Sequence, residues 1–111
     1  MTADDIQGLA LRLRGASRVV LWEKTEVYKV RGKVFAVCDP DEGLSFKVSQ
    51  IAYAVLTEDG TARQAKGFAR GHWVSVRMDV LEPEDAAGWL KASYDLVIGS
   101  LTRQARAELG L

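Results

Sequence analysis

The sequence predicts an α+β protein in which helices cover one face of an antiparallel sheet. Apolar residues recur at helical spacing near both ends of the 111-residue chain. Between these ends, short segments alternate apolar and polar residues, as strands do. Tight-turn signals, rather than crossover helices, join the first of these segments, which favours antiparallel pairing. We therefore expect one two-layer domain spanning residues 1–111.

The first helix is expected over residues 4–14. Asp4 and Asp5 fall in its first turn, where they suit the helix dipole, and Gly15 is a plausible stop. Its apolar stripe consists of Ile6, Leu9, Ala10 and Leu13. The following "SRVVLWE", at residues 17–23, is expected to be a short extended or irregular lead-in.

Three strands are expected next, as an antiparallel meander. "TEVYKVR" at 25–31 and "KVFAVCD" at 33–39 flank Gly32, which signals a tight turn. "DPDEG" at 39–43 is a second turn, because proline and glycine stand there among carboxylates. "LSFKV" at 44–48 alternates cleanly and completes the meander.

The second half of the chain is expected to hold a short helix, a strand and a long helix. Ser49 suits the N-cap of a helix over 49–58, and "HWVSVRM" at 72–78 alternates as a strand. Residues 59–71 between them are expected to form a loop or a short irregular strand. Residues 82–109 are helical in pattern, with Pro83 in the first turn. A break near 91–93 is conceivable, because Ser93 could cap a second helix.

The strand alternation predicts which side chains face away from the helices. If Val74, Val76 and Met78 face the helices, Trp73, Ser75 and Arg77 face away. Burying an unpaired charge is costly, so the lysine and arginine side chains of the strands are also placed outside. The open face is then expected to carry Lys29, Arg31, Ser45, Lys47, Trp73 and Arg77.

The segment before the last strand extends this basic character. Residues 60–78 contain no acidic residue, and the acids gather at 39–42 and 79–85. The basic residues of the segment are Arg63, Lys66, Arg70 and Arg77. A basic face with one exposed aromatic suits phosphates and stacked bases, and it equally suits an acidic protein partner. It is also the pattern of a plain solvated face, and Trp73 would be covered if the 60s loop or a second subunit lay over it.

The composition of the chain limits which functions these residues can serve. The formal net charge is zero, which counts against strong non-specific binding to nucleic acid but allows a local basic face. No apolar run approaches the roughly 18 residues of a membrane span, and "MTADDIQGL" lacks a signal pattern, so we expect a cytoplasmic protein. Cys38 is the only cysteine and His72 the only histidine. A Cys/His metal cluster cannot be built from them, and His72 is expected to be structural. We therefore expect neither an enzyme nor a cofactor.

Five stretches together resemble the MmcQ/YjbR family of small bacterial proteins. They are "LW" at 21–22, "YKVRGKVFAV" at 28–37, "LSFKV" at 44–48, "GHWVSVRM" at 71–78 and "SYDLVIGSLTRQAR" at 93–106. The positions that match the family's motifs are Trp22, Lys29, Gly32, Lys33, Phe35, Lys47, Trp73, Ser93 and Tyr94. Two departures stand out: "LWEK" replaces the family's Pro-Trp-Gly lead-in, and "HWVS" stands where "HWN" is common.

The resemblance implies an α-β(3)-α-β(2)-α two-layer fold, with the second-to-last strand near residues 64–69. Members of the family are often described as DNA-binding proteins with a double-wing motif. The fold is also similar to that of secretion chaperones, which act by binding other proteins. Function belongs to sites rather than folds, so both implications remain open.

Two functional hypotheses follow. The first is a DNA-binding protein that uses the open face and the 60–72 loop, with Trp73 stacking or wedging. Its phosphate contacts would be Lys29, Arg31, Lys47, Arg63, Lys66, Arg70 and Arg77. The alternative is a protein-interaction or adaptor module that uses the same face or an apolar surface and does not bind nucleic acid.

Overall fold

The structure is a computed structural model that describes residues 1–68 and 71–111. Within these residues, six strands form one antiparallel sheet in the order β1-β2-β3-β4-β6-β5. The strands are β1 (Ala16–Leu21), β2 (Thr25–Val30), β3 (Lys33–Asp39), β4 (Gly43–Val48), β5 (Arg63–Gln64) and β6 (His72–Val76). The helices are α1 (Ala3–Ala10), α2 (Gln50–Glu58), α3 (Pro83–Gly99) and α4 (Arg103–Glu108). The α+β fold class is confirmed.

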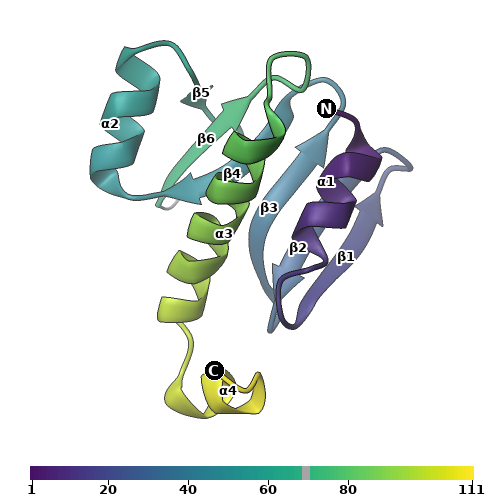
Figure 1. The fold of residues 1–111 in the computed structure, drawn as a ribbon, viewed down its shortest axis with the longest axis vertical. Coiled ribbons are helices and arrows are strands. Elements are labelled where there is room, and N and C mark those ends of the chain that lie inside the picture. The colour runs from purple at the N-terminus through teal and green to yellow at the C-terminus, as the bar shows by residue number, and fades with distance from the viewer. Residues whose placement is uncertain (69–70) are drawn as a thin grey trace.

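Helices α1 and α3 lie on one face of the sheet, and α4 lies beyond its end (Figure 1). α1 lies in front of β1 and β2, α3 crosses over the middle of the sheet, and α2 lies at the end formed by β5 and β6. The opposite face, which we call the open face, has no helix on it within the described residues. None of the helices in the described part of the chain is both long and apolar enough to cross a membrane.

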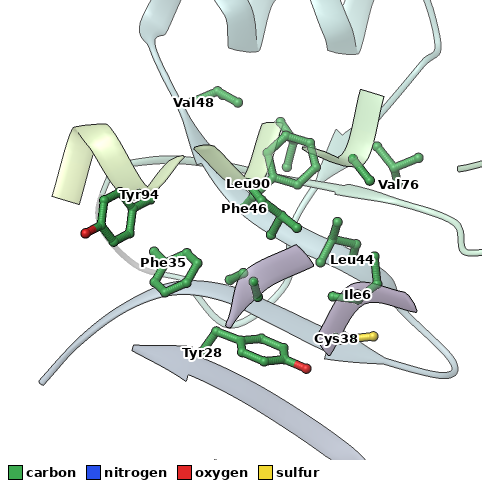
Figure 2. Close-up of a cluster of buried hydrophobic side chains, with 14 of the residues drawn as sticks. Ile6, Tyr28, Phe35, Cys38, Leu44, Phe46, Val48, Val76, Leu90 and Tyr94 are labelled. Carbon is green, nitrogen blue, oxygen red and sulfur yellow. The ribbon is translucent and has the colours of Figure 1, made fainter. Parts of the chain in front are cut away.

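The core fills the space between the sheet and helices α1 and α3. Figure 2 shows Phe35 between Tyr28 and Tyr94, with ring centroids 6.4 and 5.6 Å away. Phe46 stacks on Trp89 of α3 at 5.1 Å. The largest fully buried apolar side chains are Tyr28, Phe35, Phe46, Ile6, Leu44, Leu90, Val30 and Val74. This layer is the one that the alternation of residues 44–48 and 72–78 predicts.

Ser93 joins the sheet to α3 at a point where two strands separate. β3 carries a bulge at Phe35, because Tyr28 pairs with Ala36 while Lys29 pairs with Val34. The β3–β4 ladder ends at the pair of Ala36 and Phe46. Beyond it, the Ser93 hydroxyl accepts from the Lys47 N–H at 2.9 Å and donates to the Phe35 carbonyl at 2.6 Å. The Ser93 hydroxyl thus satisfies one main-chain donor of β4 and one main-chain acceptor of β3 beyond the end of their ladder.

Three elements differ from the sequence expectation. "SRVVLW" is extended, one of the two alternatives expected for it, but it forms a full strand, β1, so four strands instead of three precede α2. The second-to-last strand is short and comes early, at Arg63–Gln64 rather than 64–69. The long C-terminal helix breaks after Gly99 and not near 91–93, because Ser93 bonds to the sheet and Thr102 caps α4.

Candidate interaction surfaces

The open face holds four of the eight predicted binding residues, Lys29, Lys47, Arg63 and Trp73. Lys47 pairs with Trp73 and Ser45 with Ser75, so these four side chains share a face. Lys29 lies on the same face, because its neighbours Tyr28 and Val30 point into the core. Arg63 pairs with Ser75 and joins this face from β5. The side chains of these strands therefore point to the faces that the alternation predicts.

Trp73 is nevertheless not exposed: of the two alternatives considered for it, the one in which the 60s loop covers it is found, and the exposed aromatic is not. Its side chain is only 8% exposed, because the ring of Phe68 stacks on it at 4.1 Å with an interplanar angle of 7°. The 60s loop therefore covers the tryptophan face on which a base would stack. Phe68 is half-buried and becomes the outer aromatic of this pair. The only feature of the sequence that pointed to Phe68 is its place in the segment before β6, which contains no acidic residue.

Acidic side chains meet most of the predicted cations. The Arg63 guanidinium donates to the Glu42 carbonyl at 2.9 Å and to its carboxylate at 3.2 Å. Lys66 lies 3.7 Å from the same carboxylate, and Arg77 pairs with Asp79. Glu42 and Asp79 belong to the acidic segments 39–42 and 79–85, but folding brings them against the basic segment, because the β3–β4 turn places Glu42 beside β5 and β6. Exposed pairs of this kind contribute little to stability, but they reduce the positive potential of the face.

The remaining predicted cations are distributed in three ways. Arg31 lies in the β2–β3 turn and pairs with Glu108 of α4 at 2.5 Å. Lys29 and Lys47 are half-buried on the open face, and neither pairs with an acid among residues 1–68 and 71–111. A Cβ built on Gly71 would lie 3.1 Å from Cε of Lys47, so the loop before β6 passes close to this lysine. Arg70 lies outside the described residues.

The single cysteine and the single histidine of the sequence lie apart in the sheet. Cys38 pairs with Leu44 at one end of β4, and His72 pairs with Val48 at the other end. Burial, followed by the nearby carboxylates of Glu26 and Asp39, raises the pKa of the Cys38 thiol to about 11. A thiol in that state is a poor nucleophile near neutral pH. The His72 ring packs against the Tyr53 ring at 5.4 Å, as a structural histidine would.

A surface that the sequence analysis missed lies along β1, which is one edge of the sheet. Val19, Val20 and Leu21 are 41%, 42% and 40% exposed, and Trp22 at the tip of the β1–β2 hairpin is 82% exposed. Trp22 and Glu23 have φ values of 51° and 67°, in the left-handed region that residues with side chains rarely adopt. The sequence indicated this apolar surface through "VVLW" at residues 19–22, an apolar run without the alternation of a half-buried strand.

A buried hydrogen-bonded group fixes β1 to the rest of the sheet. Glu26 of β2 is 7% exposed, and its Oε1 accepts from Arg18 Nε and from the Tyr28 hydroxyl, each at 2.7 Å. Because a buried carboxylate needs such partners, this group ties Arg18 of β1 to β2. Burial and the Glu26 carboxylate both raise the pKa of Tyr28. The edge strand is therefore held firmly while its apolar side chains stay exposed.

A second apolar surface is a groove of about 400 Å³ between α2 and α3. Ile51 and Val55 of α2 are exposed beside it, at 78% and 54%. Its lining consists of Val48, Ser49, Ala52, Leu56, Trp89, Ala92, Asp95 and Leu96. Apart from Ser49 and Asp95, these side chains are apolar.

Comparison with known proteins assigns this arrangement to a family. The sequence model of the YjbR family matches residues 11–96. The chain belongs to the YjbR family. The matched residues run from the end of α1 through most of α3 and so include the whole sheet of this YjbR protein.

A solved structure supports the same assignment. The crystal structure of the Deinococcus radiodurans protein DR2400, with a DUF419 domain, is similar with a TM-score of 0.85 and 26% sequence identity. The similarity covers 99% of this YjbR chain and 88% of that one. No curated protein matches the chain. The family and the fold are thus shown, while what the surfaces bind is a separate question.

Proposed function

We propose that this YjbR-family protein is a protein-interaction module that binds a partner chain along β1 and Trp22. The observation that carries the proposal is the exposed apolar edge, where Val19 to Leu21 are each about two-fifths exposed and Trp22 is 82% exposed. A sheet edge offers unpaired main-chain groups to an incoming strand, and the flanking side chains give that pairing specificity. We propose that the protein acts in the cytoplasm, by binding rather than by catalysis and without a cofactor.

The conformation of the hairpin tip supports an interaction role. A left-handed conformation costs a residue with a side chain roughly 1–2 kcal/mol, and two successive residues adopt it here. Positive φ at both central residues is typical of the tight turns that join neighbouring antiparallel strands, and it fixes where the Trp22 side chain leaves β1. Tryptophan is moreover among the residues that contribute most to binding energy at protein interfaces. The strained turn holds Trp22 away from the sheet, where a partner can enclose it.

The interaction is tested by photo-crosslinking from β1 in cells that produce the protein. A photoreactive amino acid at position 20 is expected to form adducts with a partner, which mass spectrometry then identifies. The same residue at position 55, an equally accessible apolar site on α2, serves as the matched control. Adding Trp22→Ala is expected to reduce the position-20 adducts strongly. Equal adduct patterns from both positions would contradict binding at β1.

DNA binding through the open face is the second candidate, as the family resemblance and its double-wing label imply. The observation that favours it is that Lys47 lies beside the Phe68–Trp73 pair, and Lys29 of β2 lies on the same face. Phosphates would neutralise these lysines, and the outer aromatic, Phe68, would take the stacking role assigned to Trp73. The pairing of Arg63, Lys66 and Arg77 with acids makes a high affinity less favourable.

Salt-dependent fluorescence anisotropy with labelled duplex and single-stranded DNA tests this candidate. If Lys47 contacts phosphate, Lys47→Ala is expected to lower the slope of log affinity against log salt by about one unit. Lys91→Ala, which removes a lysine of α3 on the helix-covered side, is the control and should leave the slope unchanged. Absence of binding at low salt, or a slope of zero, rejects the candidate.

A further inference from the structure

We propose that β1 pairs antiparallel with β1 of a second copy, about a two-fold axis that passes through Val20. This inference rests on the proposed function and names its partner. The pairing would extend the sheet across two chains and place the exposed residues of both hairpins in contact. A second copy fits this edge because an antiparallel β1 can exchange main-chain hydrogen bonds with it and can place apolar side chains opposite apolar side chains.

The backbone of β1 is free to accept a strand. The Leu21 carbonyl accepts from Lys24 N at 3.3 Å inside the hairpin, so position 21 is directed toward β2. The Ala16 N–H bonds to the Leu13 carbonyl at 3.1 Å instead of to β2. Because successive residues of a strand direct their main-chain groups to opposite sides, Arg18 and Val20 present theirs to the free edge. Two copies of Val20 can therefore exchange both main-chain hydrogen bonds.

Symmetry restricts the register. A two-fold axis perpendicular to the sheet keeps every residue on its own face, and residues directly opposite each other share a face. The axis must therefore pass through a residue rather than between two. An axis at Arg18 sets two guanidinium groups opposite each other, and an axis at Val19 sets Ser17 opposite Leu21. The axis at Val20 pairs Val20 with itself and Val19 with the partner's Leu21, whereas an axis at Leu21 would set Val19 opposite the partner's Glu23.

The charged positions agree with this register. It sets Arg18 opposite the partner's Trp22, and Arg18 is oriented by its Nε bond to Glu26. A guanidinium that stacks on an indole ring gains cation–π attraction. It also sets the Ser17 hydroxyl opposite the partner's Glu23, whose carboxylate can accept a hydrogen bond. A single register thus uses Val19, Val20, Leu21 and Trp22 of both copies.

The size of this interface sets the expected affinity of the dimer. One strand and one hairpin tip from each copy make an interface at the small end for protein pairs, where complexes are transient. The dimer should therefore form and dissociate with protein concentration, which sedimentation velocity measures directly. This behaviour differs from that of an obligate dimer, which stays paired on dilution.

Charge insertion tests the pairing. Val20→Lys places two ammonium groups opposite each other at the axis and should raise the dimer dissociation constant at least about tenfold. Val55→Lys adds the same charge to an exposed valine of α2 and should leave the constant unchanged. Circular dichroism melting confirms that both variants fold. A wild-type protein that stays monomeric at high concentration, or equal weakening by both substitutions, overturns the pairing.

Crosslinking tests the register. Val20→Cys should crosslink to its own copy with a short bis-maleimide, while Ser17→Cys should not, because its two copies would lie about 20 Å apart along the strands. The native Cys38 does not interfere, because it is 2% exposed. Stronger crosslinking through position 17 overturns the axis at Val20. Photo-adducts at position 20 that contain only other proteins reject the self-pairing and leave the interaction function standing, whereas their absence rejects both.

Discussion

At the scale of single residues, Ser93 is the position on which the junction of sheet and helix depends most. It is fully buried in α3 and bonds both to the Lys47 N–H and to the Phe35 carbonyl. Ser93→Ala leaves two main-chain groups without partners, so the free energy of unfolding should fall by about 2–3 kcal/mol. Urea unfolding measures this loss. Ser17→Ala, at an exposed position of β1, is the control and should change the unfolding free energy little.

The same scale shows what sequence reasoning can and cannot supply. Alternation placed Trp73 on the open face correctly, because a strand has a fixed two-residue period. Its burial depends on Phe68, which lies in a segment without periodicity, so no pattern indicated the stacking. The neutralisation of Arg63 by Glu42 likewise depends on strand order, since β5 is brought near the β3–β4 turn through β6.

At the scale of elements, two turns with a glycine differ in what an added side chain would cost. At Gly32 the cost is backbone strain alone, whereas at Gly43 a steric clash adds to it. Gly32 and Gly43 have φ values of 78° and 97°, which disfavour any residue with a side chain. A Cβ at Gly32 meets nothing within 4 Å, whereas one at Gly43 would clash with the Val76 carbonyl. Gly32→Ala should therefore destabilise the protein by about 1 kcal/mol, and Gly43→Ala by at least about 2 kcal/mol more.

Thermal and urea unfolding of the two variants measure this difference, with each substitution serving as the control for the other. Equal destabilisation would show that the β3–β4 turn can move away from β6. The distinction could not be read from the sequence. "RGK" and "DEGL" are both plain turn signals, and only the pairing of β4 with β6 brings Val76 against Gly43.

Elements with strong periodicity were the ones that could be predicted. Residues 44–48 and 49–58 were placed correctly, because one alternates cleanly and the other begins with an N-cap serine that does accept from Ala52 N. β1 was expected only as an extended or irregular segment and not as a full strand, because Val19, Val20 and Leu21 follow one another, which gives neither a strand nor a helix period. Ser93 was considered a cap because its hydroxyl suits that role, whereas the sheet binds it instead.

At the scale of the whole molecule, Cys38 reports on global unfolding. Its thiol is 2% exposed, and burial raises its pKa to about 11. Near pH 8, only about a thousandth of such a thiol is ionised, so a thiol reagent should react slowly with the native protein. Reaction should become fast on unfolding, with a midpoint that matches loss of circular dichroism. Rapid labelling of the folded protein would instead indicate that β3 opens locally.

The net charge of the whole molecule is zero, but the charged side chains are not evenly distributed over the fold. A net charge of zero counts against strong non-specific binding to nucleic acid, but it does not show where the charges meet. Folding brings Glu42 and Asp79 to the cations of the 60–78 segment and leaves Lys29 and Lys47 at the other end of the open face. A count of charges is independent of topology, whereas the electric field at a surface is not.

The two borders of the sheet differ in length, and this difference limits assembly. β5 contributes only Arg63 and Gln64, both polar and exposed, whereas β1 offers six residues. If chains associate border to border through β1, the borders that remain are too short and too hydrophilic to recruit another chain. Growth then stops at a closed pair, and the exposed valines of β1 do not seed fibres.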